Sequence, residues 1–156
     1  MATVSDETTV IDAWINALIG KLEPAPRRKL LRDLGQDLRR TQQARIAAQH
    51  NPDGSAYEPR KGKKPRARDK AGRVRRLAMF RKLRTARYLK VTVDAAGVSI
   101  GFDDRLSRIA LIHQEGRRAP VVPGGPVVQY PARVLLGWPP EDRAEVLNHL
   151  LRYLTH

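Results

Sequence analysis

Apolar side chains recur every three or four residues in three stretches of the chain, which is the spacing of one face of an α-helix. The stretches are residues 6–22, 26–49 and 139–156. Acids at the start of the first, an Asn-Pro-Asp-Gly turn after the second and paired prolines opening the third mark helix boundaries. We therefore expect two helices near the N-terminus and one at the C-terminus. Their apolar stripes comprise Val10, Ile11, Trp14, Ile15, Leu18, Ile19 and Leu22; Leu30, Leu31, Leu34, Leu38 and Ile46; and Val146, Leu147, Leu150, Leu151 and Leu154.

Alternation of apolar and polar side chains replaces the helical spacing at residues 89–102, with a glycine-containing turn in the middle. This pattern predicts a β-hairpin. A short helix should follow, with Asp103 or Asp104 as its cap and Gly116 at its end. Residues 74–84 carry apolar side chains at helical spacing and predict a short basic helix ahead of the hairpin.

Two segments show no period. Residues 54 to about 72 mix Gly, Pro and like charges, and predict a long basic loop that is mobile or ordered by a partner. Residues 117–138 are interrupted by four prolines, so they can hold only short extended pieces, and an arm or hairpin fits best. The order of the elements predicts an α+β fold in which helices pack on one side of a small antiparallel sheet.

The composition adds few constraints. With 156 residues the chain can bury a core without disulfides, and it contains no Cys, so no thiolate metal site is expected. The first 14 residues lack a basic segment followed by an apolar run, and no apolar stretch approaches the roughly 20 residues that cross a bilayer. We therefore expect a soluble chain that is not exported and does not contact a membrane.

The net charge of +14 comes from one segment. Residues 60–90 hold fifteen Lys and Arg side chains and one acid, Asp69, whereas the other 125 residues hold fifteen of each sign. Three interpretations remain open: a solvated surface loop, contact with nucleic-acid phosphates regardless of base sequence, and docking onto an acidic protein. The candidate contact residues are Arg60, Lys61, Lys63, Lys64, Arg66, Arg68, Arg73, Arg75 and Arg76.

Aromatic side chains are sparse near this basic segment. Trp14 and Trp138 are expected to pack in the fold and not to stack on bases. The scarcity of aromatic side chains argues against a surface on which the bases of a single-stranded nucleic acid stack.

No constellation typical of catalysis, cofactor binding or metal ligation is present in the sequence, so we expect no catalytic residue, cofactor or metal. The four histidines lack metal-ligand spacing, and His113 is best explained as a partly buried packing residue. Asp103 and Asp104 suit a helix cap better than an acid–base pair, because adjacent side chains diverge. The glycine-rich stretch at 122–126 lacks the Lys-Ser/Thr of a P-loop and predicts a turn.

Five short motifs follow one another along almost the whole chain. They are Arg-Ile at 45–46, PDGSAYEPRK at 52–61, MFRKLR at 79–84, RIALIHQEG at 108–116, and YPARVLLG at 130–137 followed by Glu-Asp. In this order and spacing the chain resembles the phage virion morphogenesis, or tail completion, family of contractile-tailed phages and prophages. It has a looser likeness to tail-terminator and head–tail joining proteins. The matching motif residues are Pro52, Asp53, Gly54, Pro59, His113, Gln114, Gly116, Tyr130, Pro131, Arg133 and Gly137.

The resemblance implies a single tail completion or terminator-like domain over residues 1–156, with a structural, non-enzymatic role. Such a protein finishes the tail and prepares it for head joining, as a ring on the end of the tail tube, with a hexamer expected. Its partners would be further copies of itself and the tail tube, sheath and head–tail connector proteins, with genomic DNA as a further candidate. It would act in the host cytoplasm during assembly and remain in the virion at the tail end or neck.

Two expectations complete this picture. The arm at residues 119–130 is a second candidate for subunit contact, because such an arm has few internal partners. The alternative function is that of a protein that binds nucleic acid non-specifically through residues 60–90.

Overall fold

The structure of the chain, a computed structural model, describes residues 13–60 and 78–155. Its fold class is α+β, as predicted. The strands form two separate antiparallel pairs instead of one sheet. No described helix is long and apolar enough to cross a bilayer. After a helical segment at residues 13–20, the elements are α2 (Pro24–Ala48), β1 (Leu89–Val93), β2 (Val98–Phe102), α3 (Asp104–Glu115), β3 (Arg118–Pro120), β4 (Val127–Gln129) and α4 (Pro140–Leu154).

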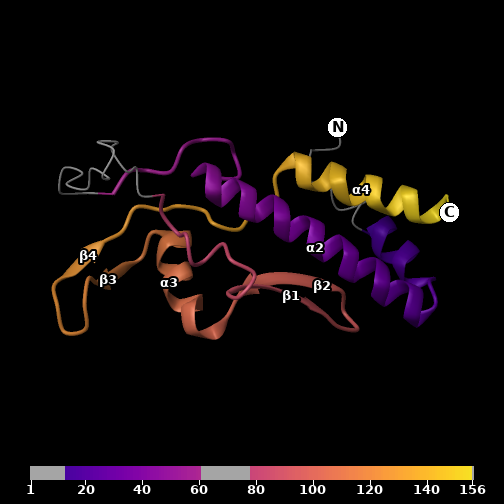
Figure 1. Cartoon of the computed structure of the whole chain (residues 1–156), viewed down its shortest axis with the longest axis horizontal. Helices are drawn as coiled ribbons and strands as arrows, with labels where there is room; N and C mark the ends of the chain where they lie inside the picture. The colour runs from indigo at the N-terminus through magenta and orange to yellow at the C-terminus, as the bar shows by residue number, and fades with distance from the viewer. Residues whose placement is uncertain (1–12, 61–77, 156) are drawn as a thin grey trace, which may run out of the picture.

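Helix α2 is the central element of the fold. Figure 1 shows α4 along one side of α2 and the β1–β2 hairpin along the other. The predicted hairpin is confirmed, with Leu89 opposite Phe102 and Val93 opposite Val98. The first core lies between these layers, so α2 must be apolar on two sides. The buried residues of this first core are Ile19, Leu30, Leu31, Leu34, Leu38, Val146 and Leu150.

Gly35, in the middle of α2, lets the β1–β2 hairpin approach the helix closely. A Cβ atom at this position would lie 2.5 Å from a methyl group of Val91 and 2.6 Å from a methyl group of Val98. Glycine costs a helix interior about 1 kcal/mol relative to alanine. The sequence therefore gives up helix propensity at this position in favour of packing between the helix and the hairpin.

Replacing Gly35 with Ala is expected to lower the free energy of unfolding by about 1 kcal/mol. Overpacking against the two branched side chains costs about 1–3 kcal/mol and outweighs the gain in helix propensity. Chemical denaturation measures the difference, and Gly20→Ala is the matched control because no atom lies within 4 Å of its added Cβ. A Gly35→Ala variant that is more stable than the wild type would show that the hairpin is not seated on the helix in this way.

A second core lies at the C-terminal end of α2, and here one prediction is wrong. Residues 79–88 form consecutive turns, so the described part of the predicted helix at 74–84 is not helical. Phe80 has φ +64°, a left-handed conformation that a right-handed helix does not contain. The core comprises Ile46, Tyr57, Met79, Leu83, Ala110 and Leu135.

The reason for this turn lies 30 residues earlier in the chain. The backbone N–H of Met79 donates to Oε1 of Gln49 at 2.7 Å, and the carbonyl of Met79 accepts from Nε2 of Gln49 at 3.0 Å. These tertiary hydrogen bonds replace the helical ones. Residues 61–77, which include the start of the predicted helix and most of the predicted basic loop, lie outside the described residues.

Residues 54–60, the described start of the predicted loop, form no helix or strand, but they are held against the rest of the fold. His50 and Ala56 form a β-bridge, and Tyr57 is buried. The carbonyls of Glu58 and Pro59 accept hydrogen bonds from Arg133. The segment is ordered by partners more than 70 residues away, which local composition does not reveal.

Several apolar side chains that were expected to pack are partly exposed. On α4, Val146 and Leu150 are buried, whereas Leu147, Leu151 and Leu154 of the predicted stripe are exposed. Trp14 and Trp138 were predicted to pack in the fold. They are 52% and 44% exposed, so each residue packs with only about half of its surface. The described residues cover only one side of the apolar surface of α4.

Candidate functional site

Residues 130–137, named the strap here, run from β4 toward α4 without forming regular structure. A buried backbone without a ladder needs other hydrogen-bond partners. Gln114 of α3 supplies three of them. Its Oε1 accepts from the backbone N–H of Leu135 at 2.8 Å and of Leu136 at 3.0 Å, and its Nε2 donates to the carbonyl of Leu136 at 2.7 Å.

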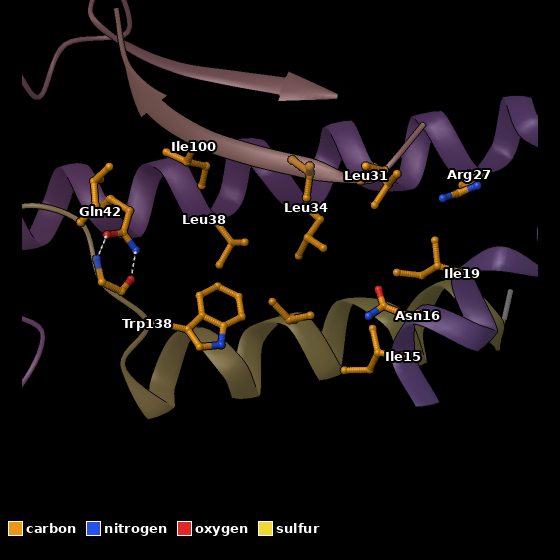
Figure 2. A pocket seen from close by; sticks show the side chains of 16 residues that line it. Ile15, Asn16, Ile19, Arg27, Leu31, Leu34, Leu38, Gln42, Ile100 and Trp138 are labelled. Carbon is orange, nitrogen blue, oxygen red and sulfur yellow. Dashed lines mark hydrogen bonds between the residues drawn. The ribbon is translucent and has the colours of Figure 1, made fainter. Parts of the chain in front are cut away.

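Side chains from α2 and the segment that follows it also hold the strap. Gln42 donates to the carbonyl of Gly137 at 3.1 Å and accepts from its N–H at 3.3 Å, as the dashed lines in Figure 2 show. Asn51 accepts from the N–H of Val134 at 2.8 Å. The hydroxyl of Tyr57 donates to the carbonyl of Val134 at 3.2 Å, and burial raises the pKa of this phenol to about 12.

A buried ion pair anchors the same end of the strap to α4. Nη1 of Arg45 lies 3.8 Å from Oδ2 of Asp142, and Nη2 of Arg45 donates to the carbonyl of Leu135 at 3.1 Å. Gln42 donates to Asp142 at 2.6 Å. Burial lowers the pKa of Arg45 and raises the pKa of Asp142, so desolvation outweighs the attraction between the charges. The pair is therefore weak evidence for a gain in stability, and its clearest contacts are those to Gln42 and the strap.

Arg133 joins the strap to the segment that leads into residues 61–77. The residue is 3% exposed, and its Nε and Nη2 donate to the carbonyls of Glu58 at 2.7 Å and Pro59 at 3.2 Å. Nη1 lies 3.5 Å from Nδ1 of His113, and the backbone N–H of Arg133 donates to the carbonyl of His113 at 2.7 Å. Three of the motif residues, Pro59, His113 and Arg133, thus meet at one place.

The ring of His113 is half-buried among aromatic side chains. Its centroid lies 4.9 Å from that of Phe80 and 5.2 Å from that of Tyr130, both in edge-to-face contact. Burial lowers the pKa of His113, and the nearby charges of Arg133 and Arg60 lower it further. The imidazole is therefore kept neutral in a positively charged environment.

The remaining motif residues shape the turns around the strap. Pro52 packs directly against Gly137, and Asp53 accepts hydrogen bonds from the N–H and hydroxyl of Ser55. Gly116 ends α3 in the left-handed conformation and packs against the strap at Ala132. The structure brings this part of the motif set to one region, although its members lie up to 85 residues apart in the sequence.

A cavity of about 720 Å³ lies beside this junction. The segment before residues 61–77 ends at Arg60 and the segment after them reaches Met79, and both residues line the cavity. Buried polar groups that converge on an apolar pocket are typical of a binding site. The described lining residues are Arg60, Met79, Phe80, His113, Val121, Val128, Gln129, Tyr130, Pro131 and Arg133.

A second hollow, of about 390 Å³, lies between α2 and α4 and is drawn in Figure 2. Leu34 and Leu38 of α2 point into it, and Ile15 and Trp138 border it. Its polar lining groups include Gln42, which already bonds to the strap. We interpret this hollow as a gap in the packing between helices.

One group of described side chains has the composition of a metal site. The ligand atoms of Asp37, Glu145 and His149 lie within 4.8 Å of one another. Arg40 pairs with Asp37 at 2.9 Å and Arg152 pairs with Glu145 at 3.2 Å, which offsets the charge that would attract a cation. Nδ1 of His149 also lies 3.4 Å from Asp37, so we interpret the group as an ion-pair cluster between α2 and α4.

Of the predicted contact residues in the basic segment, only Arg60 lies in the described part of the chain. It is exposed at the cavity. Lys61, Lys63, Lys64, Arg66, Arg68, Arg73, Arg75 and Arg76 lie outside the described residues.

Sequence reasoning missed the polar residues that hold the strap. Gln42, Asn51 and Asp142 lie in or next to predicted helices, where such side chains are usually solvated. Tyr57 lies inside a quoted motif, which was the one signal that could have drawn attention to it.

The chain matches known proteins over nearly its full length. The sequence profile of the phage virion morphogenesis family matches residues 6–155. Tail completion protein S of Escherichia phage P2 is 38% identical over 141 residues, which cover 90% of this chain and 92% of that protein. No solved structure gives a significant match. The chain therefore belongs to the phage virion morphogenesis family.

Proposed function

We propose that this protein completes a phage tail, by closing into a ring on the end of the tail tube and preparing that end for head joining. Residues 1–156 act as one domain in this role, a hexamer is expected, and the role is structural and not catalytic. The partners are the tail tube, sheath and head–tail connector proteins. The protein assembles in the host cytoplasm and stays at the tail end or neck of the virion. The name of the P2 relative supports tail completion.

The observation that carries the proposal is the exposed apolar hairpin formed by β3 and β4. In Figure 1 this hairpin extends beyond the C-terminal end of α2, away from α4 and the β1–β2 hairpin. Its valines at positions 121, 122, 127 and 128 are between 37% and 57% exposed. Contiguous exposed apolar side chains mark a surface that another protein covers. A neighbouring copy in a ring is the simplest such protein.

The described residues on either side of 61–77 lie at the same end of the molecule. Arg60 and Met79, which flank residues 61–77, line the cavity together with Val121 and Val128 of the hairpin region. The segment at 60–90 would give a hexamer a net charge of about +84. Such a density is tolerable only beside phosphate, acidic protein or open solvent. The exposed hairpin and the described residues that flank 61–77 therefore both favour partner contacts at this end.

Oligomeric state tests the proposal. The purified chain should form oligomers in light scattering at high concentration and rings in negative-stain images, alone or with tail tubes. The double substitution Val122→Thr, Val127→Thr should leave the circular dichroism spectrum unchanged and shift the chain to the monomer. Threonine keeps the shape and strand propensity of valine but makes the hairpin polar.

Ile109→Thr on α3 provides the control, because this side chain is 49% exposed but lies outside the hairpin. We expect this variant to assemble like the wild type. A wild-type chain that stays strictly monomeric and does not sediment with tail tubes would contradict the proposal.

A further inference from the structure

Two arginines, Arg60 and Arg133, bring positive charge to the lining of the cavity. Arg60 is exposed at its opening, whereas Arg133 is buried within its wall. Both charges reach the ring of His113, since each of them lowers the pKa of that imidazole. The cavity is therefore a region of positive potential in a partly desolvated environment, where electrostatic interactions are stronger than in water.

The charge of Arg133 is incompletely balanced in the described part of the chain. A guanidinium carries five N–H donors. The described partners of the Arg133 guanidinium are two neutral carbonyls, of Glu58 and Pro59, and the ring of His113. The nearby carboxylate of Glu58 belongs to an exposed residue and opposes only part of the desolvation, so the pKa of Arg133 stays lowered. An anion in the cavity would restore the balance.

The walls of the cavity are apolar and indicate what kind of anion fits. Phe80, Val121, Val128 and Pro131 line it together with Met79. A nucleic-acid phosphate is polar on all sides and would leave these side chains uncovered. A peptide that carries a carboxylate next to an aliphatic side chain matches both the charge and the walls.

We propose that this cavity binds an acidic side chain of a partner tail protein, with its carboxylate at Arg60 and Arg133 and a neighbouring aliphatic side chain against Phe80 and Val128. The inference rests on the proposed function, because it requires a partner protein at this end of the molecule. It names the chemistry of that partner as an extended segment in which an Asp or Glu is flanked by aliphatic residues.

Two peptides that differ in one group test the proposal on the isolated chain. The probes are the acetylated, amidated peptides Ser-Val-Glu-Val-Ser and Ser-Val-Gln-Val-Ser. Each peptide is titrated into the protein, and its binding is measured by NMR of the histidine ring signals. The Glu peptide should shift the signals of His113 and raise its pKa, because a nearby carboxylate favours the imidazolium form. The Gln peptide should bind about 5- to 20-fold more weakly. His50 is exposed and lies outside the cavity, so its ring signals provide the internal control.

Two variants assign the effect to the arginines. Arg133→Met should abolish the preference for the Glu peptide. Since Arg133 also holds two carbonyls, this variant could fail to fold, and Arg60→Gln provides the second measurement at an exposed position. Arg60→Gln should weaken the Glu peptide several-fold and leave the Gln peptide unchanged.

Three results would overturn the inference. The first is equal binding of the two peptides. The second is no shift of the His113 signals at about 1 mM Glu peptide. The third is displacement of the Glu peptide by an equal concentration of inorganic phosphate or of a DNA oligonucleotide. Loss of peptide binding with intact rings would remove this inference and leave the proposed function standing. Peptide binding by a chain that never forms rings or joins tails would contradict the proposed function instead.

Discussion

Replacing Gln114 with Met is expected to lower the free energy of unfolding by about 2–4 kcal/mol. Methionine has a similar length but cannot bond to the strap, so the N–H groups of Leu135 and Leu136 and the carbonyl of Leu136 lose their partner. Each buried backbone group left without a partner costs about 1–3 kcal/mol. Leu135 is fully buried, so water cannot replace the lost bond to its N–H without local opening.

Chemical denaturation measures this loss, and amide hydrogen exchange locates it. The N–H groups of Leu135 and Leu136 should exchange faster in the variant, whereas amides in the middle of α2 should follow only the change in global stability. Gln114→Glu keeps the acceptor and loses the donor, so its effect should be smaller. Gln43→Met, at a glutamine of α2 that is only partly buried, is the control and should change stability by less than about 0.5 kcal/mol. Unchanged protection of Leu135 and Leu136 in Gln114→Met would contradict this account of the strap.

Replacing Gly116 with Ala is expected to destabilise the fold by about 2–5 kcal/mol, for two separate reasons. Gly116 has φ +64°, and an L-residue in this conformation costs about 1–2 kcal/mol. An added Cβ would also lie 2.8 Å from the backbone nitrogen of Ala132 and 3.1 Å from the carbonyl oxygen of Tyr130. These are backbone atoms of the strap, which cannot move without breaking its hydrogen bonds, so overpacking adds about 1–3 kcal/mol.

A substitution at Gly124 separates the conformational cost from the cost of overpacking. It also has a positive φ, of 74°, but no atom lies within 4 Å of its added Cβ. Gly124→Ala should therefore show the conformational cost alone, about 1–2 kcal/mol, and the excess in Gly116→Ala measures the contact with the strap. Thermal or chemical unfolding of both variants provides the comparison. Equal losses in the two variants would mean that α3 and the strap are not in contact.

The sequence predicted those elements whose apolar spacing alone decides their structure. The periods of α2 and α4 and the alternation at residues 89–102 are local signals, and the structure agrees with them. The turn at Phe80 was missed because its hydrogen-bond partner, Gln49, lies 30 residues away. The anchoring of residues 54–60 was missed for the same reason, since Arg133 holds the carbonyls of Glu58 and Pro59. Local patterns do not report bonds of this range.

The site was predicted only as a set of positions. The resemblance drew attention to Gln114, Gly116 and Arg133, but it gave no reason for these residue types. The structure gives the reason. Gln114 and Arg133 bond to backbone groups that have no strand partner, and Gly116 leaves room for the strap. The cavity could not be predicted, because Arg60, His113 and Arg133 come together only in the folded chain. The partner of the basic segment stays a prediction.

The central claim is that the β3–β4 hairpin and the cavity beside it form the contact surface of a tail component. An electron cryo-microscopy map of completed tails tests this claim most directly. We predict a closed ring of this chain at the end of the tail tube, with Val122 and Val127 covered by a neighbouring protein and an acidic side chain at Arg60. Tails that lack the chain, or a ring in which the hairpin extends into solvent, would contradict it.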